Sequence, residues 1–293
     1  MLGFAASLRD SLLVASAILA AAATAGCAKA PLKAPPSLSE LVGKATGFDS
    51  GDVDSLLDRA ESTFARWTAE EVARAGEIWK TAAAADRTRI EGIVGMARAG
   101  VWLAERLEDP QARADAAERA IQAAQWCGTI APSDAACPYW LGAALGVRAR
   151  EAPTKGLKAL PLIEQSFLEA ASMNPAFELG GPDRALALLY LRAPGWPAGP
   201  GDPERGLEHA RRAISQAESW PPNLLALAQA LAANGDERAS RDAYRRAFDE
   251  ASGLLSASGS GADPGAGLGA APEGELREWI RDAGRALEPE GRR

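Results

Sequence analysis

The apolar and alanine positions of this chain recur at spacings of three and four residues from Val53 to Ala251, and short polar breaks separate the runs. That spacing places the apolar side chains on one face of a helix and predicts a succession of α-helices. Because the helical pattern itself recurs, it is typical of stacked hairpins, each of which buries its apolar face against the next. We therefore expect an all-α domain over residues 53–251.

The clearest repeat unit spans Asn223 to Ser252, and Gly235 and Asp236 separate its two helices. Its packing positions are Leu224, Leu227, Ala228, Leu231, Tyr244 and Ala247. Small residues at such positions let the two helices approach closely, and the aromatic side chain fills the gap to the next hairpin. The unit resembles a tetratricopeptide repeat, which implies a tetratricopeptide-like α-solenoid of antiparallel helical hairpins. An irregular helical bundle is the alternative fold.

The other predicted units are less regular. Residues 54–85 are expected to form one further hairpin, on which Trp67 and Trp79 pack. Prolines close three later units, at Pro132, Pro175 and Pro222. These units exceed the regular period of about 34 residues, so we expect an enlarged loop inside each hairpin, on one face of the solenoid. The three insertions are LEDPQARADA (107–116), REAPTKGLKALP (150–161) and APGWPAGPGDP (193–203).

The N-terminus carries a predicted signal peptide over residues 1–26. Arg9 precedes an apolar run, Ser11 to Ala23, that is shorter than a membrane span, and small residues then lead to Cys27. This end resembles the lipobox of bacterial lipoproteins, with Thr24 where leucine is usual. The resemblance implies a lipid anchor on Cys27. Ala28 after it favours anchoring to the outer membrane, with the protein in the periplasm. Ordinary secretory cleavage, an uncleaved anchor or a buried cysteine are the alternatives.

The remaining segments differ in composition from the helical domain. Residues 27–52 contain AKAPLKAPPS, whose prolines favour an extended tether that holds the body clear of the lipid surface. Residues 252–272 are rich in Gly, Ala and Ser and are expected to be a flexible linker. Residues 273–293 are expected to form a C-terminal amphipathic helix and tail, which caps the open end of the solenoid. Its apolar positions are Leu276, Trp279, Ile280 and Leu287.

Charge and reactive residues exclude several classes of function. The net charge of −7 comes with scattered Lys and Arg and no basic stripe, which argues against nucleic acid as a partner. The sequence has one histidine and three irregularly spaced cysteines, so we expect no metal site. His209 is expected to be a partly exposed helical residue without an acid–base partner. We predict a protein that is not an enzyme and has no cofactor.

Two of the cysteines are close in the sequence. Cys127 and Cys137 flank the turn GTIAPSDAA, and both would lie in an oxidising compartment if the chain is exported. We predict a disulfide between them. Two separate, buried packing residues are the alternative.

The 193–203 insertion combines a rigid loop with a helix start. Asp202 is expected to be an N-cap, because Pro203 and Glu204 suit the first turn of a helix. Upstream, Pro194 and Pro197 restrict the backbone around Trp196. A rigid aromatic residue on a loop can anchor a ligand or a partner. Alternatively, Trp196 folds back into the groove between its own helices, which is the simpler expectation.

Arg184 is expected in the first turn of a helix, where the helix dipole disfavours a cation. A carboxylate must therefore neutralise it. That carboxylate belongs either to an organic-acid substrate or to a neighbouring Asp or Glu, and we favour the internal salt bridge.

Three motifs in GGPDRALALLYLRAPGWPAGPGDPERGLEHARRA, residues 180–213, carry a family resemblance. They are Gly180-Gly181-Pro182 with Arg184, Ala193 to Pro197, and Gly201-Asp202. Together with PPNLLALAQAL, Pro221 to Leu231, they resemble the T-component family of tripartite ATP-independent periplasmic (TRAP) transporters, periplasmic lipoproteins of tetratricopeptide-like hairpins. The resemblance covers residues 134–251.

This resemblance implies a homotrimer around a central pore and a periplasmic solute-binding protein as partner. The candidate binding or interface residues are Arg184, Tyr190, Pro194, Gly195, Trp196, Pro197 and Asp202. The alternative function is a general tetratricopeptide scaffold at the outer membrane that serves envelope assembly or secretion.

Overall fold

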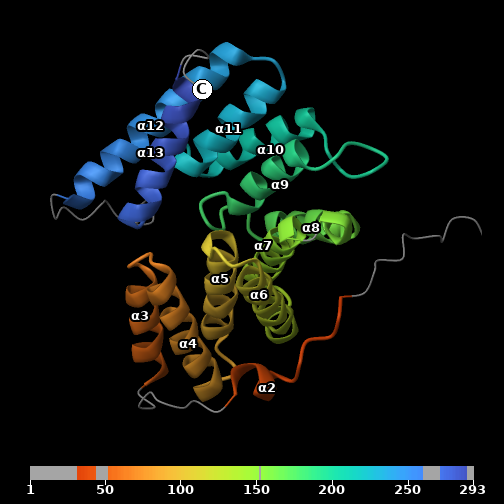
Figure 1. Ribbon diagram of the computed structural model, residues 1–293, viewed down its shortest axis with the longest axis vertical. Helices are drawn as coiled ribbons and strands as arrows, with labels where there is room; N and C mark the ends of the chain where they lie inside the picture. The colour runs from red at the N-terminus through yellow and green to blue at the C-terminus, as the bar shows by residue number, and fades with distance from the viewer. Residues whose placement is uncertain (1–31, 44–51, 152, 260–270, 289–293) are drawn as a thin grey trace, which may run out of the picture. The chain divides into compact units, whose positions relative to one another are not determined.

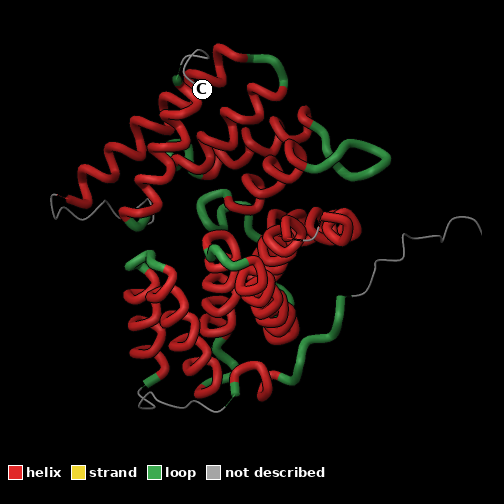
Figure 2. Tube along the Cα trace, in the orientation of Figure 1, coloured by secondary structure: helices red, strands yellow, loops and turns green. Residues whose placement is uncertain are grey.

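A computed structural model describes residues 32–43, 52–151, 153–259 and 271–288, and those from Lys33 onward belong to one compact unit. Within these ranges the backbone forms helices and loops, without strands (Figure 2). The helices are α2 (Leu38–Val42), α3 (Val53–Phe64), α4 (Ala69–Ala85), α5 (Ile90–Arg106), α6 (Pro110–Ile130), α7 (Ala136–Glu151), α8 (Pro153–Met173), α9 (Gly181–Arg192), α10 (Pro203–Gln216), α11 (Pro221–Ala233), α12 (Glu237–Gly259) and α13 (Glu273–Leu287) (Figure 1). None of these described helices is both long and apolar enough to cross a membrane.

Helices that are neighbours in the sequence pack as hairpins. α3 packs on α4, α5 on α6, α7 on α8, α9 on α10, and α11 on α12, while α13 packs against α12 (Figure 1). The predicted all-α architecture of stacked hairpins is confirmed, including the hairpin expected over residues 54–85.

Small residues set the close spacing within these hairpins. A Cβ on Gly95 of α5 would lie 2.2 Å from the ring of Trp79, which is 1% exposed on α4. A Cβ on Gly100 would lie 2.9 Å from the Ala116 carbonyl oxygen and from the Ala120 Cβ of α6. Larger residues at these two positions would force the helices apart.

Two of the three predicted loop insertions are helical instead. Pro110 is the first residue of α6, where a missing N–H costs nothing, and the Asp109 side chain caps that end by accepting from the Ala112 N–H at 2.7 Å. α8 contains Pro161 in its interior, so most of the 150–161 insertion is helix as well. The units are long because their helices are long. Of the three insertions, only the one at residues 193–202 forms an enlarged loop.

The segment expected to be a free tether is docked onto the helical body over residues 33–42. The Pro36 carbonyl accepts from the indole N–H of Trp126 on α6 at 2.8 Å. Val42, on the unpredicted short helix α2, is 1% exposed and packs with residues of α4, α5 and α6. The tether prediction is therefore wrong for these residues, because they have apolar and hydrogen-bonding partners on α6. Cys27 and the signal peptide lie outside the described residues, as do residues 44–51.

The C-terminal region also differs from its prediction. α12 continues through Gly259, so Ser252 to Gly259 is helical and not linker; residues 260–270 lie outside the described residues. α13 forms as predicted, and its Trp279 packs edge-on against Trp220 at a centroid distance of 5.1 Å. The same helix reaches α5, because Arg106 Nη2 lies 3.0 Å from a Glu278 carboxylate oxygen.

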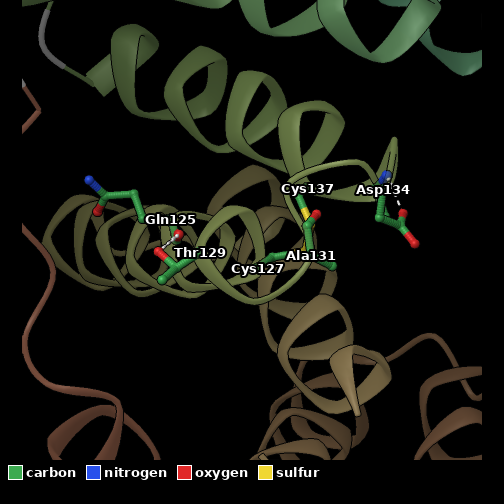
Figure 3. Close-up of a disulfide and its surroundings, with 7 residues drawn as sticks. Gln125, Cys127, Thr129, Ala131, Asp134 and Cys137 are labelled. Atoms are coloured by element: carbon green, nitrogen blue, oxygen red, sulfur yellow. Dashed lines mark hydrogen bonds between the residues drawn. A yellow bond between two sulfur atoms is a disulfide. The ribbon is translucent and has the colours of Figure 1, made fainter. Parts of the chain in front are cut away.

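A disulfide joins Cys127 and Cys137, with an S–S distance of 2.02 Å, and ties the end of α6 to the start of α7 (Figure 3). Both cysteines are almost completely buried. The Asp134 carboxylate, also visible in Figure 3, accepts from the Ala136 N–H at 2.9 Å and orders the turn between them. The bonded pair is the one predicted from the sequence.

Candidate functional site

The loop over residues 193–202 is closed by backbone hydrogen bonds. The Gly201 N–H donates to the Pro194 carbonyl, and the Asp202 N–H donates to the Tyr190 carbonyl, both at 2.9 Å. A Cβ on Gly201 would lie 2.1 Å from the Ala193 carbonyl oxygen, so only glycine fits there. The loop extends away from α9 and α10 in Figure 2, with both of its ends fixed.

Trp196 lies on this loop and is 90% exposed. The expectation that it fills the groove between its own helices is wrong. Pro194, Gly195 and Pro197 are exposed beside it, and the Trp196–Pro197 peptide bond is cis. Backbone hydrogen bonds between residues 190–202 close the loop, and the indole on it points into solvent. An exposed large aromatic side chain is therefore presented on a backbone of fixed shape.

Asp202 begins α10 as predicted. One carboxylate oxygen accepts from the Glu204 N–H at 3.1 Å and from the Arg205 N–H at 3.0 Å. Tyr190, by contrast, is 1% exposed and is no surface residue. Its hydroxyl donates to Glu164 at 2.7 Å and accepts from Arg205, so it joins α8, α9 and α10.

His209 is buried, which corrects the expectation of a partly exposed residue with no partner. Its Nδ1 lies 2.7 Å from an Asp183 carboxylate oxygen, and each of the two side chains is 6% exposed. The ring also lies against Tyr190, with a centroid distance of 5.3 Å. Sequence reasoning missed the pair because Asp183 and His209 lie on neighbouring helices, 26 residues apart.

Arg184 has no ion pair with any described carboxylate, so the predicted internal salt bridge is wrong. Its guanidinium donates to Asn223 Oδ1 at 2.7 Å and, over 3.3 to 3.4 Å, to the carbonyls of Glu178 and Leu179. Asn223 is fully buried on α11, and its side-chain amide nitrogen donates to the Leu179, Ala213 and Ala217 carbonyls. Oxygen dipoles thus stabilise the cation without cancelling its charge.

Arg184 also lines a cleft of about 690 Å³. The cleft lies among α3, α5, α7, α9, α11 and α13, and its volume is in the range of small-molecule sites. Its aromatic lining consists of Phe64, Trp67, Trp102, Tyr139, Trp140, Trp220 and Trp279. Sequence reasoning missed this site. The available signal was the eight tryptophans of the chain, of which five line the cleft.

Two further arginines lie over rings of the cleft wall. The Arg98 guanidinium is 4.1 Å from the centroid of Phe64, and Arg106 is 4.8 Å from that of Trp102. Both also have carboxylate partners, Glu61 for Arg98 and Glu278 for Arg106, at 3.0 Å. Their charges are therefore largely neutralised within the protein.

Glu275, on α13, is the cleft-lining acidic residue whose pKa is clearly shifted. Desolvation raises the pKa of its half-buried carboxyl to about 7, against the opposing effect of Arg106 and Arg184. Burial likewise raises the pKa of Tyr139 to about 12. Glu275 is therefore largely protonated below pH 7 and ionised above it.

A second, apolar groove of about 430 Å³ lies beside the Trp196 loop, among α7, α8 and α9. Leu157, Leu160 and Leu189 line it together with Pro194 of the loop. Leu157 is 48% exposed. The loop and the groove together place apolar surface on one side of the α8–α9 region.

No cluster of three or more His, Cys, Asp or Glu that could hold a metal ion is found in the part of the chain that the structure describes. No protein-family model and no curated protein matches the sequence.

The solved structures similar in fold include the following two. One is TTC0263, a tetratricopeptide-repeat protein of Thermus thermophilus, with a TM-score of 0.56 and 15% identity over 79% of this chain and 98% of that chain. The other is pilF of Pseudomonas aeruginosa, with a TM-score of 0.50 and 16% identity over 80% of this chain and 90% of that chain. The chain therefore has an all-α, tetratricopeptide-like solenoid fold, the fold expected from its repeats.

Proposed function

We propose that the protein is a non-enzymatic scaffold that binds another protein, as a membrane-anchored periplasmic accessory of a TRAP-type transporter. The tetratricopeptide-like fold supports protein binding in general, because stacked helical repeats present extended surfaces to partners. The finer assignment is supported by the T-component-like motifs in residues 180–213. The partner we propose is the periplasmic solute-binding protein of the transporter.

The observation that carries this proposal is the exposure of Trp196. At 90%, it is the most exposed large hydrophobic side chain among the described residues. Its loop is fixed at both ends, so ordering it on binding costs little entropy, and tryptophan is enriched at the energetic centres of interfaces. Leu157 and the apolar groove beside Pro194 extend the same surface. We propose that the solute-binding protein docks on the Trp196 loop and this groove.

The absence of catalysis is part of the proposal. The pair that most resembles catalytic machinery, Asp183 and His209, is buried between α9 and α10 and faces neither cleft nor groove. A buried acid–histidine pair without access for a substrate acts in packing.

Site-directed photocrosslinking in the native periplasm tests the partner. A photoreactive phenylalanine analogue at position 196 is expected to capture a solute-binding protein, whereas the same analogue at exposed Arg245 of α12 is expected to capture none. Trp196→Ala should reduce copurification at least tenfold. Capture of an envelope-assembly or secretion protein instead would favour the general-scaffold alternative. Equal capture from both positions would contradict a docking role for the loop.

The anchor and the oligomeric state have separate tests. If Cys27 is lipidated, Cys27→Ser should move the protein from the outer-membrane fraction to the soluble periplasm. Light scattering coupled to size exclusion should report a homotrimer for the T-component type. A monodisperse monomer would contradict that part of the proposal.

A further inference from the structure

The aromatic cleft shares Val101, Glu105 and Ala143 with the apolar groove proposed for docking. Trp196, Leu157 and Pro194, which carry the docking proposal, do not line the cleft. We propose that this cleft binds a small organic anion, a carboxylate carried on a flat, apolar body. The inference stands on the cleft alone and does not depend on the transporter assignment.

A cation without a carboxylate partner and two indole N–H groups without acceptors give the charge of the ligand. Arg184 is the one arginine of the cleft that has no carboxylate partner among the described residues. The indole N–H groups of Trp102 and Trp140, both in the cleft wall, are buried and have no hydrogen-bond acceptor. Trp102 is only 7% exposed, so this donor is costly to leave unpaired. A ligand that supplies a negative charge and acceptor oxygens would neutralise Arg184, whose present acceptors are all uncharged, and would offer acceptors to the two indoles.

The rings give the shape of the ligand. Tyr139 and Trp140 form one edge-to-face pair with centroids 5.0 Å apart, and Trp220 and Trp279 form another at 5.1 Å. Both pairs line the same cleft as Arg184. Aromatic surfaces of this kind bury flat apolar groups well, and the volume of about 690 Å³ suits a ligand of one or two fused rings.

A cationic ligand fits this cleft less well, although aromatic residues and glutamates are present. Arg106 and Arg98 already place a cationic guanidinium group over one face of Trp102 and of Phe64. An aromatic cage for a quaternary ammonium group needs such faces free. Arg184 would also repel a cation.

Glu275 makes binding depend on pH. The charged groups that act on its carboxyl are Arg98, Arg106, Arg184 and Glu278. Glu105, Glu178 and Tyr139 line the same cleft. With a pKa of about 7, it loses its proton near neutrality and then repels an incoming carboxylate. Affinity for the anion should therefore fall as the pH rises from about 6 to about 8, and Glu275→Gln should remove most of this dependence.

Isothermal titration calorimetry of the full-length chain at a pH of about 6 tests the ligand class. The probes are the aromatic carboxylates benzoate, 2-naphthoate and indole-3-acetate. Three controls accompany them: 2-naphthamide, which is uncharged, acetate, which is an anion without an aromatic ring, and a naphthyl trimethylammonium salt, which is a cation. At least one aromatic carboxylate should bind with one-to-one stoichiometry. Naphthamide, acetate and the ammonium salt should bind at least tenfold more weakly than the best aromatic carboxylate.

Variants locate the site. Arg184→Gln should weaken carboxylate binding at least tenfold, and Arg184→Lys should restore part of it. Trp140→Phe keeps the ring and removes the indole N–H, so it should weaken binding several-fold without threatening the fold. Arg245→Gln, at an exposed arginine of α12 that lines neither the cleft nor the groove, is the control and should bind as the unmodified chain does. Circular dichroism verifies that each variant is folded.

Three results would overturn the inference. These are no binding by any aromatic carboxylate, equal binding by the amide or the ammonium salt, and unchanged carboxylate binding in folded Arg184→Gln and Trp140→Phe. Crosslinking from position 196 reports separately on protein docking and should be unaffected by Trp140→Phe. Failure of one proposal is therefore distinguishable from failure of the other.

Discussion

The Trp196 loop and the aromatic cleft both present tryptophan side chains, but different parts of the chain hold them in place. In the loop, backbone groups within residues 190–202 bond to one another, and the single indole is 90% exposed. In the cleft, side chains from helices far apart in the sequence hold the rings, and Trp102 and Trp220 are each at least nine-tenths buried. The loop is thus a local structure, whereas the cleft depends on the whole stack.

This difference predicts which substitutions each region tolerates. The loop should be sensitive to added Cβ atoms and insensitive to removal of its indole. The cleft should be sensitive to loss of the side chains that support it and to the charge state of Glu275.

The largest expected effect is on the support of the cleft. Asn223→Ala removes a fully buried amide whose nitrogen donates to three backbone carbonyls and whose oxygen accepts from Arg184. Since these groups would stay buried and unpaired, we expect a loss of about 3 kcal/mol in the free energy of unfolding. Urea denaturation measures it. Exposed Asn174→Ala is the control and should cost less than about 1 kcal/mol; equal losses would show that the buried network adds nothing.

The backbone of the loop should give the next largest effect. Gly201→Ala places a Cβ 2.1 Å from the Ala193 carbonyl oxygen, and we expect a loss of about 2 kcal/mol in the free energy of unfolding. Gly253→Ala in α12, where a Cβ meets nothing within 4 Å, should instead stabilise the chain by about 0.5 kcal/mol. Thermal denaturation compares the two. Similar melting temperatures for both variants would argue against a closed loop.

The charge of Glu275 should have a smaller effect that depends on pH. Its pKa rises from an ordinary value of 4.5 to about 7 on folding, so the folded state holds a proton that the unfolded state has released between these values. Stability should therefore decrease as the pH rises through this window, and the cost is fully present above a pH of about 7. Glu275→Gln should stabilise the chain by about 1 kcal/mol at a pH of about 8, after allowance for solvent screening, and by less at a pH of about 5. An equal gain at both pH values would contradict the shift.

The smallest effect is expected for the exposed indole. Trp196→Ala removes a side chain with little buried surface, so the free energy of unfolding should change by less than about 0.5 kcal/mol, by chemical denaturation. A loss above about 2 kcal/mol would show that the indole packs on the chain in solution.

Local signals in the sequence predicted much of the fold. The helical period indicated the order of the hairpins, and the α10 start at Pro203 followed from Asp202 as its cap. The same reasoning misjudged Pro110 and Pro161, because a proline is compatible with a helix start or a kinked helix as well as with a loop. Packing on neighbouring helices decides whether the proline lies in a loop, at a helix start or in a kinked helix. Packing also decides that residues 33–42 dock on the helical body.

The two candidate surfaces also differ in how far the sequence predicted them. The loop around Trp196 was identified from adjacent glycines and prolines, although whether the indole points inward was not. The partners of Arg184 and His209, and the cleft itself, depend on residues brought together by the stacked helices, such as Trp67 and Trp279. Periodicity identifies which face of each helix is apolar. It does not say which tryptophans from separate hairpins share one cavity.

The contact between Arg106 of α5 and Glu278 of α13 joins residues 172 positions apart, and α13 supplies one wall of the cleft. Chains are made from the N-terminus onward, and early segments fold while later ones are still being added. The hairpins and the Trp196 loop can therefore form before the cleft exists. A chain shortened after α12 would keep the Trp196 loop and lack one wall of the cleft, so an intact cleft reports that α13 is in place.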